Sequence, residues 1–367
     1  MVEWKTLGEV LTVHTGKQLN RSGLSEVGAY PVINGGRTPS GYTDIPNENQ
    51  NTITISQGGE SAGFVNWIDT AFWAGAHCFV VENCTNQNIR FLYHLLKNNE
   101  KKIMESKQGA GIPGLNRKNL YALLIPVPSL EEQERIVGIL DTFTGSIENL
   151  KEQIAQRKKQ YEFYRDQLLN LEGKPGVEMK TLGEIAKYRR GSFPQPYGNR
   201  EWYDGEGAMP FVQVADVEEF GRKLKDKTKQ FISTLAMPKS VYVPKGTVIV
   251  TLQGSIGKVA ITQYDAYIDR TLGIFEGYII DINKIFFALQ LEKIFSIKRE
   301  KARGGTIKTI TKEEFTNFSI PVPPLAEQER IVAILDTFEA SIKNLEEQLN
   351  ERQKQYEYYR EKLLTFE

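Results

Sequence analysis

The chain has 367 residues, of which 40% are hydrophobic, 25% charged and 10% aromatic, a composition that predicts two or three globular domains and excludes intrinsic disorder. Its 46 basic residues balance its 46 acidic ones, so the net charge alone predicts no nucleic-acid partner. The apolar runs are too short for a membrane helix, no signal region opens the chain, and two cysteines cannot make a disulfide framework, which together favour the cytoplasm and no membrane partner.

Residues 1–128 are predicted to form a mixed α/β domain with short strands. Strands over 51–56 and 64–68 flank a glycine-containing loop, 57–63, and a helix is expected over 89–107. Glycine lets a backbone approach a phosphate closely, and nearby Lys or Arg adds charge. A tight turn beside a solvated charge explains any single loop equally well.

Two patterns in this first domain resemble chemical sites and are interpreted as structural. Residues 109–114 match G-x-G-x-x-G, but they follow a charged helix instead of a strand and include a proline, which argues against dinucleotide binding. His77, Cys78, Cys84 and His94 lack the spacing of a zinc site, and their apolar neighbours favour core packing. No metal site is therefore expected.

The segment 129–172 is predicted to be a long helix that pairs with a second helix, 324–367. Both lack internal prolines beyond their first residues, and their apolar residues alternate between spacings of three and four, interrupted only by Arg157 and Arg352. About 40 residues at ~1.5 Å each make a rod of roughly 60 Å. Two independent surface helices are the alternative. The predicted pairing residues are Ile136, Leu140, Phe143, Ile147, Leu150, Ile154, Ile331, Leu335, Phe338, Ile342, Leu345 and Leu349.

Residues 173–323 are predicted to form a second mixed α/β domain. Strands over 246–252 and 259–261 flank another glycine-containing loop, 253–258, and a helix is expected over 284–301. The order of strand, loop, strand and helix matches the first domain.

The chain repeats itself. Residues 125–172 and 320–367 align without a gap at an offset of 195, and 32 of these 48 positions are identical. A weaker echo at an offset of 175 relates residues 3–10 to residues 178–185. The chain is therefore two copies of one unit whose ends match and whose middles differ, as expected of one frame that carries two different readers.

Charge divides in the same way. Residues 1–128 carry +1 (11 basic, 10 acidic) and residues 179–323 carry +6 (22, 16), whereas 129–178 carry −3 (7, 10) and 324–367 carry −4 (6, 10). A polyanion would therefore meet the variable regions.

These features predict an α+β fold in which two mixed α/β domains are separated by an intramolecular antiparallel coiled coil, with a pseudo-two-fold axis. The antiparallel direction follows because the ends of a domain often lie close together, so the second helix begins near the end of the first. The predicted domains are 1–128, 129–172, 173–323 and 324–367.

A two-fold protein with a reader at each end suits two inverted half-sites on double-stranded DNA. Arg reads guanine and Gln or Asn reads adenine in the major groove, while Lys meets phosphates. Solvated surface side chains are the competing interpretation at every position. The candidate DNA-binding residues are Arg37, Gln57, Lys107, Gln108, Arg117, Arg190, Gln213, Gln253, Lys258, Arg270, Arg303 and Lys308.

No catalytic residue is predicted. The sequence has no G-x-S-x-G elbow and no Asn/Asp-Pro-Pro-aromatic run of the amino-methyltransferase type, and residues 254–258 lack Walker spacing. Carboxylates are plentiful only on the long helices, where they are expected to be solvated.

The repeated motifs carry a family likeness. A Lys-Thr-Leu-Gly-Glu start at residues 5–9 and 180–184 is followed at the end of each domain by a Pro-Val-Pro-x-Leu-x-Glu-Gln-Glu-Arg-Ile motif, at 126–136 and 321–331. This arrangement resembles the DNA-specificity (S) subunits of bacterial type I restriction–modification systems, over essentially the whole chain.

The resemblance implies a non-catalytic subunit with two target-recognition domains, each reading one half of a bipartite site. It also implies that the helices bind two methyltransferase (modification) subunits, with restriction subunits in the full complex. S-adenosylmethionine and ATP are then expected on those partners, and no cofactor on this chain.

Two other functions compete with this one. A coiled-coil scaffold whose end domains bind protein or carbohydrate would lack a steep salt dependence of DNA affinity. A fused methyltransferase would bind S-adenosylmethionine as an isolated chain.

Overall fold

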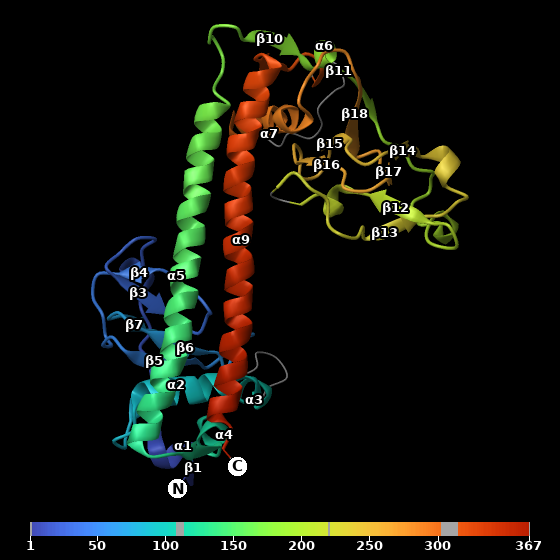
Figure 1. Cartoon of the computed structure of the whole chain (residues 1–367). Coiled ribbons are helices and arrows are strands. Elements are labelled where there is room, and N and C mark those ends of the chain that lie inside the picture. The colour runs from blue at the N-terminus through green and yellow to red at the C-terminus, as the bar shows by residue number, and fades with distance from the viewer. Residues whose placement is uncertain (1, 108–113, 219–220, 302–314, 367) are drawn as a thin grey trace. The chain divides into compact units, whose positions relative to one another are not determined.

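The computed structural model describes residues 2–107, 114–218, 221–301 and 315–366. It divides into two compact units, Met1–Glu152 with Glu346–Glu367, and Gln153–Leu345. Each unit therefore contains one globular part and a piece of each long helix (Figure 1). The predicted boundaries at 128, 172 and 323 remain predictions, because the two units divide the chain within the long helices.

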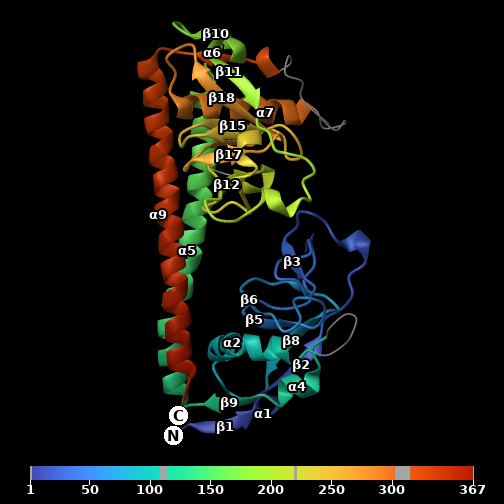
Figure 2. The same cartoon turned by 90° about the vertical axis from the view of Figure 1, so that its right-hand side faces the viewer.

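The two ends of each globular part are paired with each other. In unit 1, β1 (Glu3–Thr6) pairs antiparallel with β9 (Leu124–Val127), and Figure 2 shows them side by side next to the start of the long helix α5 (Leu130–Leu168). In unit 2, β10 (Glu178–Thr181) pairs in the same register with β19 (Ser319–Val322). In each unit, the repeated sequence at the start of the globular part thus forms a strand that pairs with the repeated sequence at its end.

A short helix follows each of these opening strands, α1 (Leu7–Val10) and α6 (Leu182–Ile185). Thr6 with Glu9, and Thr181 with Glu184, form the same capping box, which explains the repeated Thr-Leu-Gly-Glu sequence.

The globular part of unit 1 contains two main sheets. One has the strand order β2-β8-β5-β6, the other β4-β3-β7, in which β3 and β7 run parallel. The predicted strands over 51–56 and 64–68 are β5 and β6, each one residue shorter at its start. The strands are β2 (Leu11–Thr15), β3 (Tyr30–Ile33), β4 (Tyr42–Thr43), β5 (Thr52–Ser56), β6 (Val65–Ile68), β7 (Trp73–Ala74) and β8 (Cys78–Asn83), with the 3-10 turn η1 (Arg21–Gly23).

Unit 2 repeats this architecture with longer loops. Its sheets have the orders β11-β18-β15-β16 and β13-β12-β17-β14, and β12 and β17 again run parallel. The strands are β11 (Ala186–Arg190), β12 (Met209–Val212), β13 (Gln230–Ile232), β14 (Val241–Val243), β15 (Val248–Thr251), β16 (Val259–Ile261), β17 (Ala266–Ile268) and β18 (Leu272–Tyr278). The 3-10 turns are η2 (Arg200–Trp202), η3 (Val214–Asp216) and η4 (Met237–Lys239).

One predicted helix is wrong in its length. The segment 89–107 forms two helices, α2 (Ile89–Asn98) and α3 (Glu100–Glu105), because Asn99 leaves the helical region at φ −92° and ψ 4°. Its side-chain amide donates to the carbonyl of Leu95 (2.9 Å), a local hydrogen bond of the kind with which asparagine ends helices. The counterpart α7 (Lys284–Lys301) is continuous, and α4 (Arg117–Tyr121) completes unit 1.

The long helices are α5 (Leu130–Leu168) and α9 (Leu325–Leu364), and they pair antiparallel in each unit. In unit 1, Phe143 of α5 stacks on Tyr359 of α9, with ring centroids 5.2 Å apart. In unit 2, Tyr164 of α5 stacks on Phe338 of α9 at 5.3 Å. The predicted antiparallel direction is confirmed, because early residues of one helix meet late residues of the other in both units. All twelve predicted pairing residues are buried or partly buried.

The two arginines that interrupt the apolar spacing lie over aromatic rings. The guanidinium carbon of Arg157 lies 5.9 Å from the centroid of Phe338, and that of Arg352 lies 5.6 Å from the centroid of Phe143. This cation–π contact repeats at equivalent positions in the two units, and it lets a cation remain beside an otherwise apolar row.

No helix among the described residues is both long enough and apolar enough to cross a bilayer.

Candidate nucleic-acid interface

One edge of unit 2 brings together the carboxyl ends of two parallel strands. Gln213 directly follows β12, and Arg270 follows β17 by two positions. The backbone N–H of Asp269 donates to the carbonyl of Val212 (3.0 Å), which joins the two strand ends. Two of the predicted base-reading side chains therefore start from neighbouring backbone.

The neighbouring sheet ends at the same edge. Arg190 is the last residue of β11 and pairs with Gly273 at the start of β18. Gln253 follows β15, and the preceding Leu252 donates its N–H to the carbonyl of Thr271 (2.8 Å). Lys258 lies beside Thr251 across the β15–β16 hairpin, where its N–H donates to the Thr251 hydroxyl (2.9 Å). All five predicted residues that are described in unit 2 thus share one edge, which we call the second loop edge (Arg190, Gln213, Gln253, Lys258, Arg270).

Asp269 orders this edge, and sequence reasoning missed it. Its carboxylate accepts hydrogen bonds from the hydroxyl of Tyr197 and from the N–H of Thr271 (3.0 Å). Burial, followed by the hydrogen bond to Asp269, raises the pKa of Tyr197, so its hydroxyl stays a donor. The guanidinium of Arg270 lies 5.1 Å from the Tyr197 ring centroid, so this exposed arginine has a preferred direction. Nothing in the local sequence of Asp269 marks this role.

Unit 1 has a corresponding edge, the first loop edge (Arg37, Gln57, Arg117). Gln57 directly follows β5, and its N–H donates to the carbonyl of His77 (2.9 Å). Gly35, two residues before Arg37, packs against that same carbonyl, so a Cβ there would lie 2.8 Å from its oxygen. Arg117 donates to the hydroxyl of Thr15, the last residue of β2 (2.6 Å).

A surface hollow of about 490 Å³ opens at the first loop edge. The guanidinium of Arg117 lies 5.2 Å from the ring centroid of Phe79, and both residues line the hollow. Gln57 and Asn116 also line the hollow, and both carry an amide, the side-chain type that pairs with adenine. Each edge therefore bears two exposed arginines and at least one half-buried glutamine, and the first edge is in addition hollowed.

Lys107 is placed differently from the other predicted residues. Its ammonium group donates to the carbonyl of Glu60 (3.4 Å), within the glycine-containing loop that follows Gln57. This hydrogen bond of Lys107 is thus to the loop 57–63, at Glu60 and not at the three residues that define the first loop edge. Gln108, Arg303 and Lys308 lie outside the described residues, and their predicted role stays a prediction.

Both edges are closed by a glycine that no other residue can replace without movement. A Cβ on Gly16 would lie 2.3 Å from the carbonyl oxygen of Ala74, and one on Gly191 would lie 2.2 Å from that of Ile268. Gly16 follows β2 and packs against the last residue of β7, and Gly191 follows β11 and packs against the last residue of β17. The two edges therefore share one backbone design and carry different side chains.

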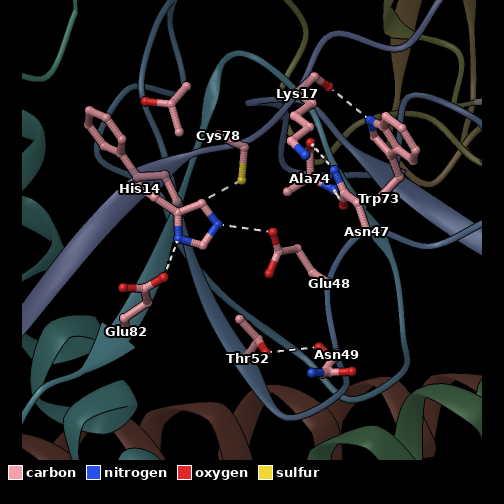
Figure 3. A network of polar contacts seen from close by, with 12 residues as sticks. His14, Lys17, Asn47, Glu48, Asn49, Thr52, Trp73, Ala74, Cys78 and Glu82 are labelled. Carbon is pink, nitrogen blue, oxygen red and sulfur yellow. Dashed lines mark hydrogen bonds and ion pairs between the residues drawn. The ribbon is translucent and has the colours of Figure 1, made fainter.

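A polar network in unit 1 joins residues of β2, β7 and β8 with the loop before β5 (Figure 3). His14 of β2 lies between two carboxylates, with Nε2 3.0 Å from Glu48 and Nδ1 2.9 Å from Glu82. The side-chain amide of Asn47 exchanges hydrogen bonds with the backbone of Ala74, the last residue of β7 (2.6 and 3.1 Å). These contacts connect the two sheets of unit 1 where the edge loops begin.

The predicted core packing is confirmed for Cys78 and His94 and is wrong for His77 and Cys84, which are exposed. Cys78 is buried, and burial raises the pKa of its thiol to about 12, whereas Cys84 is exposed. His94 is fully buried between the long helices, with Nε2 2.8 Å from Asp141 of α5 and Nδ1 3.1 Å from the Tyr356 hydroxyl of α9. Across the described ranges, no group of three or more His, Cys, Asp or Glu side chains could hold a metal ion.

Comparison with known proteins gives one consistent family. Residues 1–157 and 175–353 match the family model described as the type I restriction modification DNA specificity domain. The chain is 30% identical over 393 residues to the type I restriction enzyme EcoR124I/EcoR124II specificity subunit of Escherichia coli, covering 100% of this chain and 94% of that protein. It is 29% identical over 385 residues to the putative type I restriction enzyme specificity subunit S.HindORF215P of Haemophilus influenzae, covering 100% and 96%.

Solved structures share the fold. The S subunit of a type I restriction–modification system from M. genitalium aligns with a TM-score of 0.67 and 20% identity, covering 100% of this chain and 97% of that one. A chain from a structure on complex assembly and conformational transition of the type I R-M system aligns with a TM-score of 0.62 and 21% identity, covering 99% and 97%.

Proposed function

The chain belongs to the family of type I restriction–modification DNA specificity subunits, and from this we propose that each globular part reads one half of a bipartite DNA target. The globular part between β1 and β9 (Glu3–Val127) is then the first reader, and that between β10 and β19 (Glu178–Val322) is the second reader. The protein provides sequence specificity, and the paired long helices hold its two readers.

The single observation that carries this proposal is the pair of loop edges. They are built on one backbone design, with the same parallel strand pair and the same close glycine. Their exposed arginines nevertheless stand on different elements, after β3 and in α4 on the first edge and in β11 and after β17 on the second. Sequence is read by side chains on base edges, so one frame with two unlike edges suits two unlike half-sites.

We propose that the chain is not itself an enzyme and that partner subunits perform the chemistry. Two methyltransferase subunits would bind S-adenosylmethionine, and restriction subunits would use ATP. The helical repeat supports this stoichiometry, because one chain that presents the same helix sequence twice offers two copies of one docking surface. The target is cellular DNA, which places the proposed action in the cytoplasm.

Mapping of methylated bases tests the proposal in cells with and without the gene. The expected result is a bipartite motif, with two short defined sequences and an unspecified spacer, that disappears with the gene. Exchange of residues 179–319 for another reader should then change one half of the motif. A change in both halves, or methylation without a bipartite motif, would refute the model.

The comparisons do not favour the alternative, a scaffold that binds protein or carbohydrate. The dependence of DNA affinity on salt separates the two functions, because phosphate contacts release counterions. A flat salt dependence would revive the scaffold.

A further inference from the structure

A buried arginine fastens the second reader to both long helices. Arg222 is only 7% exposed, although it lies on a loop between two strands of the reader. Its guanidinium donates to Glu339 of α9, to the hydroxyl of Tyr161 of α5 (3.2 Å) and to Glu292 of α7 (3.3 Å). Tyr161 also donates to Glu339 (2.7 Å), which closes the network.

The network holds one cation, Arg222, and two carboxylates, those of Glu292 and Glu339. Burial lowers the pKa of Arg222, but Glu292, Tyr161 and Glu339 together more than reverse this effect, so the arginine stays charged. Without Glu339 the guanidinium would keep Glu292 and the Tyr161 hydroxyl but lose the acceptor of its second terminal NH2 group, and a buried N–H without a partner is costly. The backbone of Arg222 is also held in place. The residue has a positive φ of 49°, and its carbonyl accepts the N–H of Ile261 in β16 (2.9 Å).

The connection reaches the second loop edge by two short routes. Arg222 lies nine residues after Gln213, on a loop whose turn is fixed by the buried carboxylate of Asp216, which accepts the N–H groups of Gln213 and Lys229 (both 2.8 Å). Through Ile261 it also connects to β16, the strand that pairs with β15 before Gln253. A shift of Arg222 would therefore move the side chains proposed to read bases.

The first reader is fastened at the same turn of the repeated helix by different residues. Arg90 of α2 donates to Asp141 (2.7 Å) and to the hydroxyl of Thr144 (3.3 Å) on α5. An offset of 195 relates Asp141 to Asp336 and Thr144 to Glu339, and it relates Arg90 to Ile285, which cannot form such bonds. The helices thus differ where the readers attach, with threonine at the first site and glutamate at the second.

We propose that Arg222 is the positioning residue of the second reader and that Glu339 makes the second helix specific for it. This inference rests on the proposed function. A second reader attached at the first site would place buried Arg222 against Thr144 and lose one of its two carboxylates. A first reader attached at the second site would find Asp336 and Glu339 in front of Arg90, so its attachment tolerates the exchange.

Matched substitutions test this in the full chain assembled with its methyltransferase subunits. Glu339→Thr gives α9 the residue of α5, and Thr144→Glu gives α5 the residue of α9. The probe is a DNA duplex with the bipartite motif found by methylation mapping, alongside duplexes with one base pair more or fewer between the half-sites. The readout is the ratio of Kd values for altered and native spacers.

The wild-type chain should discriminate between spacers, and Glu339→Thr should lower that ratio by on the order of tenfold or more, as for the loss of a hydrogen bond to a charged group. The reason is that a second reader held less firmly by α9 can move to contact a half-site that lies one base pair nearer or farther. Thr144→Glu keeps an acceptor for Arg90 and should retain the wild-type ratio. A merely structural role for Glu339 would lower thermal stability and leave the ratio unchanged, which would overturn the proposal.

A second experiment, which looks for a gain of function, tests the proposal even if the Glu339→Thr variant does not fold. A chain in which the second reader also replaces residues 3–127 should methylate a motif built from two copies of its half-site only when Thr144→Glu is present. Equal methylation with threonine at position 144 would overturn the proposal. A wild-type chain without any bipartite motif would refute the proposed function instead, so the two failures are distinguishable.

Discussion

Replacement of Gln328 by leucine should loosen the attachment of α7 while leaving the rest of the chain in place. Gln328 lies in the second turn of α9 and is 1% exposed. Its side-chain amide donates to the carbonyl of Pro323 (2.9 Å) and accepts the N–H of Asn283 (2.9 Å). Asn283 in turn accepts the N–H groups of Ile285 and Phe286, so the glutamine supports the residue that caps α7.

The size of the effect follows from the groups that lose their partners. Leucine has a similar volume but leaves one N–H and one carbonyl without a partner, at about 1–3 kcal/mol each. Burial of the extra apolar surface of leucine offsets about 1–2 kcal/mol. The free energy for opening the start of α7 should therefore fall by about 1–4 kcal/mol, and amide exchange there should rise about five- to a thousandfold.

Hydrogen exchange is the appropriate assay, because a chain of two units does not guarantee a two-state melting curve. The repeat provides a matched variant, Gln133→Leu, since Gln133 accepts the N–H of Asn88 and donates to Pro128 in the same way (both 2.9 Å). Each variant should raise exchange only at its own capped helix, α7 or α2. An exposed substitution, Gln167→Leu, is the control. Equal exchange at α7 in Gln328→Leu and in this control would refute the reasoning.

Two further predictions concern pH and the glycine at the second loop edge. Burial lowers the pKa of His94 against the opposing effect of Asp141, so the unfolded chain takes up a proton below about pH 6.5 that the folded chain resists. The free energy for opening α2 should be fully present above that pH and fall below it by up to about 1.4 kcal/mol per pH unit, and His94→Gln should remove this slope in hydrogen exchange of α2 from pH 6.5 to 5. Gly191→Ala should weaken binding of the second half-site, because its Cβ would lie 2.2 Å from the Ile268 carbonyl oxygen, whereas Gly198→Ala meets no atom within 4 Å and should change neither binding nor stability measurably. Equal DNA affinity in the two alanine variants would contradict the close contact at the edge.

The architecture was predictable because it depends on patterns within single segments. A repeat at an offset of 195 residues, with apolar residues spaced for a paired helix, already specifies two matched helices and two globular parts. The antiparallel direction needed only the closeness of domain ends, which the pairing of β1 with β9 and β10 with β19 explains.

The details that depend on distant residues were not predictable. The end of α2 at Asn98 depends on one side-chain hydrogen bond, whereas the surrounding charge pattern continues as a helix. The order at the second loop edge depends on Asp269 meeting Tyr197, 72 positions away, across strands whose parallel pairing has no local signal. Candidate residues could be named from their loop position and type, but what holds them in place could not.

The contacts in this chain divide into those that recur in both units and those that do not, and the division has a functional consequence. Three kinds of contact recur in both units, and each involves backbone atoms. They are the capping boxes at Thr6 and Thr181, the hydrogen bonds of Gln133 and Gln328 to proline carbonyls, and the packing of Gly16 and Gly191 against backbone carbonyls. A frame held through backbone groups accepts new loop side chains without losing its own contacts, so specificity can change while the fold persists. The arginines that fasten the readers do not recur, because they use side chains of the variable parts. The side chains of a loop edge should therefore be replaceable while the reader stays folded and attached. Moving a whole reader to the other helix position, in contrast, should also require the helix residues that its arginine contacts.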